Sequence, residues 1–124
     1  MRIKYVQPEV CLQSYKSILG QRPIWDWRHD KLLWVDIYEN KIIESDQNNF
    51  QEKHYIVSEG VTNILLQDNE NYLMSSYDSL FSLHSSISKK DLLTKISLEN
   101  SDNRINDADL DLNGQVWIST MDTQ

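Results

Sequence analysis

The stretch PIWDWRHDKLLWVDI at residues 23–37 contains an apolar strand, an acidic turn and a second strand rich in apolar and aromatic residues. The same plan recurs in two later segments, TNILLQDNENYLMSS at residues 62–76 and ADLDLNGQVWISTMD at residues 108–122. The matching positions Trp34, Met74 and Trp117 lie 40 and 43 residues apart. A period of about 40–45 residues with four strands per unit is typical of β-propeller blades, whereas a β-sandwich would not predict the recurrence. The repeat therefore favours a propeller.

Short runs of apolar or alternating residues predict the individual strands. The expected strands lie at residues 31–37, 41–45, 54–57, 63–67, 72–75, 80–84, 92–97, 108–112 and 115–120. The last two are joined by Asn113-Gly114, a dipeptide typical of β-hairpin turns. Residues 8–19 lie between a proline and a glycine, which is helix punctuation, so helix or strand stays open there. Ser88 to Leu93 has the composition of one helical turn.

The fold predicted is an all-β, partial β-propeller within a single domain of residues 1–124. We expect about two and a half blades, preceded by an N-terminal strand or extension over residues 1–18. The expected blades lie at residues 19–58, 61–98 and, incomplete, 104–122. Closed propellers use roughly 4–8 blades, and each blade buries both faces against neighbours. We therefore expect either further C-terminal blades or a homo-oligomer in which copies cover the open faces.

Charge and composition exclude several classes of partner. The 124 residues include 12 Lys and Arg against 19 Asp and Glu, which gives a formal net charge of −7. Because basic residues form no cluster, neither nucleic acid nor an anionic membrane is an expected partner. No run approaches the roughly 20 apolar residues of a membrane span, and the N-terminus lacks the apolar segment of a signal peptide. Cys11 is the only cysteine and can form no intramolecular disulfide, so we expect a cytoplasmic protein.

Two stretches carry residue types suited to binding chemistry. Residues 19–26, LGQRPIWD, form a turn that leads into a strand, and residues 103–107, NRIND, precede the last strand pair. Arginine suits a carboxylate or a developing oxyanion, and Asn and Asp oxygens suit a hard divalent cation. The plainer interpretation of NRIND, which the residue types alone favour, is a turn in which Asn106 and Asp107 cap backbone groups and Arg104 is solvated.

The aromatic and histidine residues have structural interpretations. The four tryptophans fall on strand-like segments and are expected in the core rather than on a surface that stacks against carbohydrate. His29 lies in the turn Arg28-His29-Asp30 and has no second histidine nearby in sequence, so a solvated loop position is expected rather than a metal ligand.

Four motifs occur in the order and spacing of a known family: LGQRPIWD at 19–26, LLWVDI at 32–37, NRINDA at 103–108 and GQVWISTMD at 114–122. From about Leu19 to its end the chain resembles the N-terminal part of the senescence-marker-protein (regucalcin)/gluconolactonase family. The resemblance implies a six-bladed propeller that holds one divalent metal, which is calcium, zinc, manganese or magnesium, at the mouth of its central channel. It also implies hydrolysis of sugar lactones or related esters.

The resemblance assigns site residues one position at a time. Gln21 falls where the family has its first metal-binding Glu, and it keeps an oxygen but loses the charge, which weakens the position. Arg104 and Asn106 match the Arg and Asn that contact substrate, with Asp107 as possible support. The other metal ligands, an Asn and an Asp that is also the expected general base, belong to later blades. No catalytic residue is therefore expected within this chain. Glycines of the family are replaced at three positions, Arg22, Ala108 and Ser119.

These assignments lead to two functional hypotheses. The first is a metal-dependent, gluconolactonase-like hydrolase of a small-molecule lactone or ester, of which this chain carries only the N-terminal part of the site and is inactive alone. The second is a non-catalytic binding or interaction module, or a truncated relic of the lactonase fold. The neutral Gln21 supports the second hypothesis. A fragment of a longer enzyme fits the sequence equally well.

Overall fold

The structure is a computed structural model that describes residues 5–10, 12 and 14–124. In this part of the chain the regular structure is entirely β. The strands are β1 (Gly20–Asp26), β2 (Lys31–Asp36), β3 (Lys41–Asp46), β4 (Glu52–Ile56), β5 (Asn63–Leu66), β6 (Asn71–Ser75), β7 (Ser79–His84), β8 (Lys90–Lys95), β9 (Asn103–Leu110) and β10 (Val116–Asp122). Among the described residues no helix has the length and apolar character needed to cross a membrane.

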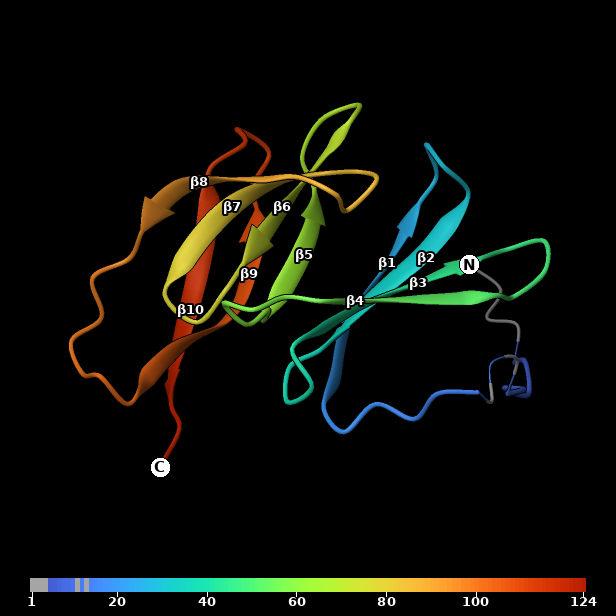
Figure 1. The fold of residues 1–124 in the computed structure, drawn as a ribbon, viewed down its shortest axis with the longest axis horizontal. Helices are drawn as coiled ribbons and strands as arrows, with labels where there is room; N and C mark the ends of the chain where they lie inside the picture. Colours follow the sequence, from blue (N-terminus) through green and yellow to red (C-terminus); the bar gives the residue numbers. More distant parts are fainter. Residues whose placement is uncertain (1–4, 11, 13) are drawn as a thin grey trace.

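The strands form three antiparallel sheets in which neighbours in sequence are neighbours in space (Figure 1). The first sheet has the order β1-β2-β3-β4, the second β5-β6-β7-β8, and the third contains β9 and β10. The first strands of the sheets lie together, since β1 contacts β5 and β5 contacts β9. The prediction of an all-β chain with two complete four-stranded units and half of a third is confirmed.

Most predicted strands are present, and the Asn113-Gly114 loop joins β9 to β10, with Gly114 at a φ of 77°. The helical turn that Ser88 to Leu93 could also form is not present, because residues from Lys90 onward pair with β7 as strand β8. The plainer interpretation of NRIND as a turn is also wrong, because these five residues lie inside β9.

The N-terminal expectations have mixed outcomes. The described residues among 8–19 form neither helix nor strand. Of the N-terminal strand or extension expected over residues 1–18, residues 1–4 lie outside the described part, and Tyr5 and Val6 are exposed and irregular. Cys11 also lies outside the described residues.

Asp36, at the end of β2, ties this irregular segment to the first sheet. The buried carboxylate accepts hydrogen bonds from the Tyr15 hydroxyl at 2.8 Å and from the backbone N–H groups of Ile18 and Leu19 at 2.8 and 3.1 Å. Partial burial, together with the hydrogen bond to Asp36, raises the pKa of Tyr15 to about 12. The contact fixes the chain just before β1, where the predicted site begins.

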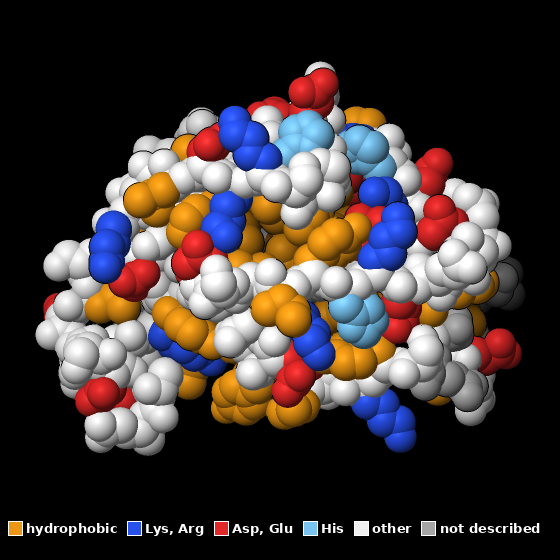
Figure 2. Space-filling view, viewed as in Figure 1, with side chains coloured by type: hydrophobic (Ala, Val, Ile, Leu, Met, Phe, Trp, Pro, Cys, Tyr) orange, Lys and Arg blue, Asp and Glu red, His pale blue; other side chains and the backbone are white. Residues whose placement is uncertain are grey.

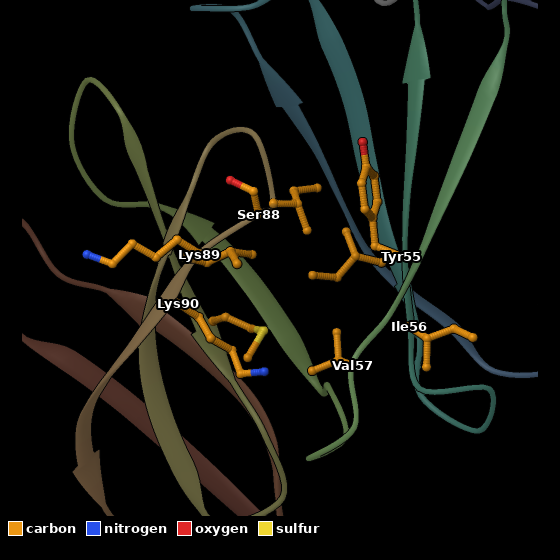
Figure 3. A pocket seen from close by; sticks show the side chains of 10 residues that line it. Tyr55, Ile56, Val57, Ser88, Lys89 and Lys90 are labelled. Carbon is orange, nitrogen blue, oxygen red and sulfur yellow. The ribbon is translucent and has the colours of Figure 1, made fainter.

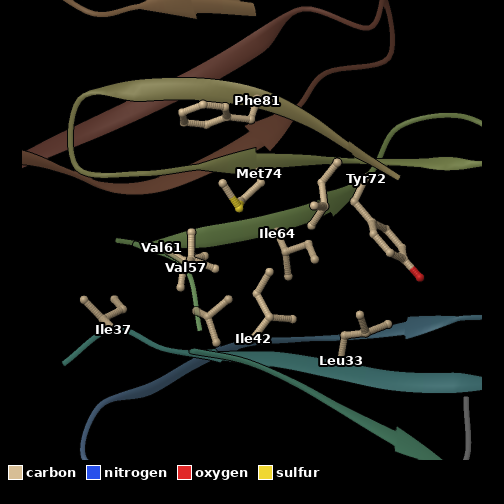
Figure 4. Packing of buried hydrophobic residues seen from close by; sticks show 11 residues of the cluster. Leu33, Ile37, Ile42, Val57, Val61, Ile64, Tyr72, Met74 and Phe81 are labelled. Carbon is tan, nitrogen blue, oxygen red and sulfur yellow. The ribbon is translucent and has the colours of Figure 1, made fainter. Parts of the chain in front are cut away.

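A hydrophobic core joins the first two sheets (Figure 4). Its buried members are Leu33, Val35, Ile37, Ile42, Val57, Val61, Ile64, Tyr72, Met74, Phe81 and Leu83. A second, smaller core joins the second sheet to β9 through Leu65, Leu73, Leu80, Ile105 and Ala108. Since side chains on successive strand positions face opposite ways, these apolar residues face the neighbouring sheet. The three sheets are therefore packed face to face in chain order.

The tryptophans are mostly outside this core, contrary to expectation. Trp25, Trp27 and Trp117 are 44%, 68% and 67% exposed, and Trp34 is half-buried with its indole N–H donated to Ser17 Oγ at 3.2 Å. On β1 the alternation places Asp26 inward, so that its neighbour Trp25 faces out. Leu, Ile and Val residues fill the interior instead.

Asp26 is buried where the first two sheets meet and is surrounded by hydrogen-bond donors. Its Oδ1 accepts from Arg28 Nε at 2.7 Å, and its Oδ2 accepts from Arg28 Nη2 at 3.0 Å and from the Tyr72 hydroxyl at 2.5 Å. His29 lies exposed in the turn between β1 and β2, as the sequence predicted, and its Nδ1 is 2.8 Å from the same Oδ2. Burial alone would raise the pKa of Asp26, but the hydrogen bonds from Arg28, Tyr72 and His29 hold it well below its usual range.

Candidate functional site

Two strands about eighty positions apart in sequence line one groove. β1 contributes Gln21, Arg22, Pro23 and Ile24, and β9 contributes Asn106 and Asp107, around a volume of about 600 Å³. Three of the four residues assigned from the sequence, Gln21, Asn106 and Asp107, are thus brought together. They meet because β1 and β9 are the first strands of their sheets and both adjoin β5.

Arg104, the fourth assigned residue, does not line this groove. Its side chain is mostly buried, and its Nη1 donates to the backbone oxygen of Ile105 at 3.0 Å and to Asn106 Oδ1 at 3.4 Å. Arg104 borders a separate cavity of about 280 Å³, together with Tyr38 and Tyr77. It therefore reaches the groove through the Asn106 side chain that it holds.

A bulge in β1 creates the groove's first wall. The pairing of β1 with β2 skips between Gln21 and Ile24, and Arg22 within the bulge has a φ of 54°. This left-handed region is costly for a residue other than glycine. The irregularity lets consecutive residues Gln21 and Arg22 border the same space, although side chains in a regular strand alternate between faces. The family that the chain resembles has glycine at this position, and glycine adopts a positive φ without steric cost.

The Arg22 side chain spans the groove to β9. Its Nη2 lies 3.0 Å from Asp109 Oδ1, and its Nη1 lies 3.9 Å from Asp107 Oδ1. The backbone N–H of Leu110, and then the Arg22 guanidinium, lower the pKa of Asp109. The Nε of Arg22 is buried without a hydrogen-bond partner. The sequence analysis noted Arg22 only as a replaced glycine, and the acidic residues opposite it, Asp107 and Asp109, were the available signal.

Asn63, the first residue of β5, is a further part of the site that sequence reasoning missed. The side chain is fully buried, and its Nδ2 donates to Asp107 Oδ1 at 2.5 Å and to the backbone oxygen of Ala108 at 2.8 Å. Its Oδ1 has no partner. Asn63 thereby holds the Asp107 side chain at the groove, and no local motif marks it because its partner lies 44 residues away.

The groove as described does not fit a divalent cation. Gln21 and Asn106 offer only neutral amide oxygens, and Asp107 Oδ1 already accepts from Asn63 and from the backbone N–H of Ala108. The Arg22 guanidinium adds a positive charge between the carboxylates that would attract a metal. In the described part of the chain, no group of three or more His, Cys, Asp or Glu residues could hold a metal ion.

A second hollow lies between the first two sheets (Figure 3). Hydrophobic side chains gather near the middle of the corresponding face, bordered by charged residues (Figure 2). The hollow measures about 190 Å³ and is lined by Ile42, Tyr55, Ile56, Val57, Met74, Leu83, Ile87, Ser88, Lys89 and Lys90. Both lysines are engaged, since Lys90 Nζ lies 2.8 Å from Glu59 and Lys89 Nζ lies 3.3 Å from Asp91. The hydrogen bond from Lys90 lowers the pKa of Glu59 to about 2. The hollow is therefore a gap between two sheets whose two lysines are already held by acidic neighbours.

Comparison with known proteins places residues 19–124 within the model of the family described as SMP-30/Gluconolactonase/LRE-like region. Regucalcin from Gallus gallus is 25% identical over 111 residues, which cover 90% of this chain and 37% of the relative. Regucalcin from Bos taurus is 26% identical over 111 residues, with the same coverage. Regucalcin from Homo sapiens is 24% identical over 121 residues, which cover 98% of this chain and 38% of the relative. The chain thus spans less than two-fifths of the length of these relatives.

Solved structures agree on the fold. A regucalcin from Agrobacterium tumefaciens, described as a calcium-binding protein, matches with a TM-score of 0.81 and 21% identity over 90% of this chain and 38% of that protein. A luciferin-regenerating enzyme matches with a TM-score of 0.75 and 21% identity over 87% of this chain and 38% of that protein. Both are β-propellers, so the predicted partial β-propeller is confirmed.

Proposed function

Because the chain belongs to the SMP-30/gluconolactonase/LRE-like family, we propose that it carries the N-terminal part of a site that hydrolyses a sugar lactone or a related ester. The observation that carries this proposal is the groove in which β1 and β9 bring Gln21, Asn106 and Asp107 together. In this proposal the groove receives the substrate's oxygen atoms. Asn106 contacts the substrate directly in this proposal, and Arg104 acts through Asn106 from outside the groove.

The contacts of Arg104 and Asn106 support a different role for each residue. Arg104 is held by the backbone oxygen of Ile105, and the bond from its Nη1 to Asn106 Oδ1 orients the Asn106 amide. With its oxygen occupied, that amide presents its N–H donors to a substrate oxygen. A guanidinium and an amide donor stabilise negative charge as it develops on a carbonyl oxygen during attack by water. Arg104 therefore acts as a positioning residue for Asn106 and as a source of positive potential.

The chain does not supply every part of the reaction. A divalent metal, as implied by the family, would supply a Lewis acid, but the donor set of the groove does not fit one and we assign no step to it. Asp107 is a poor general base because one of its oxygens already accepts two hydrogen bonds. We therefore propose that the 124-residue chain alone binds substrate weakly and does not turn it over.

This proposal is tested by measuring binding and turnover separately. The probe for binding is glucono-δ-lactam, which cannot hydrolyse at the lactone bond, and the expected affinity is weak, about 1 mM. Asn106→Ala and Arg104→Lys are expected to weaken binding at least about tenfold, since each removes a hydrogen-bonded polar contact of the site. Lys53→Ala, at an exposed residue of β4, is the matched control and is expected to bind like the wild type.

Turnover is measured by pH-stat with glucono-δ-lactone, with and without added calcium or manganese. The wild type is expected to release acid no faster than the uncatalysed reaction. Turnover that Arg104→Ala abolishes would contradict the proposed inactivity of the chain alone. Absence of lactam binding, or binding equal in all variants, would contradict the proposed site.

A non-catalytic binding module is a second candidate function. The observation that favours it is the replacement of charge in the groove, where a neutral Gln21 stands beside a cationic Arg22. In that case the same residues bind a hydroxylated small molecule without hydrolysing it. Lactam binding without turnover in a ring that contains all its blades would favour this candidate over the hydrolase.

The third sheet points to a partner of the chain. Strand β10 has no neighbour beyond β9 in the described part, and apolar side chains lie exposed on these two strands and their loop. They are Leu110, Leu112, Val116, Trp117 and Met121. An unpaired strand edge with exposed apolar residues favours association. We propose that a second copy of the chain covers this surface.

We also propose a cytoplasmic location, because the sequence contains a single cysteine and so cannot form an intramolecular disulfide.

A further inference from the structure

Arg22 has an unusual backbone position for its residue type. Among the described residues, five other than glycine have positive φ values, and four of them, Asp30, Asn40, Phe50 and Ile87, lie in or beside turns. Arg22 is the exception, because it lies within strand β1. A strained residue that persists inside a strand is a sign of function when its side chain has a defined task.

The task of the Arg22 side chain is visible in its contacts. The guanidinium pairs with Asp109 at 3.0 Å and lies 3.9 Å from Asp107, so that one positive charge stands between two carboxylates. The same groove contains the amide groups of Gln21 and Asn106. Carboxylate and amide oxygens are the ligands that calcium and manganese prefer. Without Arg22 the carboxylates of Asp107 and Asp109 would have no guanidinium between them.

Two buried polar atoms show that this corner is not fully satisfied. Arg22 Nε has no hydrogen-bond partner, and neither has Oδ1 of the fully buried Asn63. The Asn63 oxygen belongs to the same amide whose Nδ2 contacts Asp107, so it lies at the edge of the acidic pair. Buried polar atoms normally have partners, so these two atoms leave one donor and one acceptor available to a ligand or a water at this corner.

We propose that the Arg22 guanidinium is a tethered cation that takes the position of a divalent metal in this groove, so that the site polarises its ligand with Arg22 and binds metal only when Arg22 is removed. The inference does not require the proposed hydrolase function, because it concerns cation binding by this chain itself. It explains together why Gln21 is neutral, why Arg22 tolerates a positive φ, and why its side chain faces two carboxylates.

The test is manganese binding to the 124-residue chain, followed as paramagnetic broadening of backbone amide signals. Arg22→Gly removes the cation and suits the positive φ, and Arg22→Gln removes the charge while keeping most of the length. Both variants are expected to acquire a manganese site with a dissociation constant of about 1 mM or tighter, with broadening confined to residues 21–24 and 106–109. Adding Gln21→Glu to Arg22→Gly is expected to tighten binding further, about tenfold, because a carboxylate replaces an amide ligand.

Two controls separate this effect from a general change in charge. Lys41→Gln removes a cation of similar exposure that pairs with Glu39 at 3.0 Å on another part of the chain, and it is expected to acquire no site. Arg22→Lys keeps the tethered charge and is expected to bind no manganese. The proposal is overturned if the wild type shows the same localised broadening at the same manganese concentration. It is equally overturned if the folded Arg22→Gly and Arg22→Gln variants show none.

Discussion

Replacing Asp26 by Ala is expected to lower the free energy of unfolding by about 3–5 kcal/mol, because it leaves a buried charge without its partner. The Arg28 side chain is only 8% exposed, and two of its guanidinium nitrogens donate to Asp26. The Tyr72 hydroxyl would also lose its acceptor. Because Asp26 belongs to β1 and Tyr72 to β6, the loss falls on the joint between the first two sheets. Urea unfolding followed by tryptophan fluorescence measures the change.

Asp91→Ala is the matched control for Asp26→Ala. Asp91 pairs with Lys89 at 3.3 Å, but both side chains are largely exposed, so its removal is expected to change stability by less than about 0.5 kcal/mol. Equal effects of the two substitutions would contradict a structural role for the buried cluster. Asp26→Asn is a second variant that keeps the volume while removing the charge.

Acid is expected to weaken the same contact between the first two sheets. Since the folded pKa of Asp26 lies below the unfolded value, its contribution is present above the unfolded pKa, about 3.9, and is lost as the pH falls through the folded pKa. The wild type is therefore expected to lose stability steeply below about pH 4, and Asp26→Asn should lose less over the same range. Parallel acid profiles for the two proteins would contradict this assignment.

Ile64→Ala is expected to lower the free energy of unfolding by about 2–5 kcal/mol, which is the range for truncating a buried Ile. Ile64 lies on β5 with no exposure and points toward Ile42 and Leu33 of the first sheet (Figure 4). The cavity would open between two sheets rather than within one. Chemical unfolding observed by fluorescence and by circular dichroism should therefore shift as a single transition, with both probes moving together.

Ile56→Ala removes the same atoms from an exposed position. Ile56 ends β4 and is 78% exposed, so its truncation is expected to change stability by less than about 0.5 kcal/mol. A small effect of Ile64→Ala, or separate transitions for the two probes, would mean that the first two sheets do not share one core.

The sequence predicted the strands well because strand formation here follows local alternation. Period-two patterns and the Asn113-Gly114 turn carry their own information, whichever sheet they join. Ser88 to Leu93 is the ambiguous segment, because its Lys and Leu residues suit a helix by intrinsic preference. Pairing of β8 with β7 outweighs that preference. The expected burial of Trp25 was wrong, because a large aromatic residue does not by itself indicate which face of its strand is buried.

The candidate site was only partly predictable for a different reason. Gln21, Arg104, Asn106 and Asp107 were assigned through motifs, and the structure brings three of them to one groove. The residues that hold the groove together act across sheets. Asn63 contacts Asp107 from a position 44 residues away, and such a contact cannot be predicted from local spacing.

The roles of Arg22 and of the cluster around Asp26 were not predicted from the sequence, for related reasons. Arg22 depends on a bulge that period-two patterns do not encode. The cluster around Asp26 likewise needs Tyr72, which lies 46 residues away. Long-range polar partners therefore mark the limit of what this sequence alone could predict.

We propose that a second copy of this chain covers the exposed third sheet of its two and a half propeller blades. Light scattering on the purified 124-residue chain at several concentrations tests it most directly. The expected result is a stable mass that is a multiple of the 14.6 kDa chain, and that falls toward the monomer when Trp117, which is 67% exposed, is replaced by Lys. A well-folded monomer at every concentration would contradict the claim.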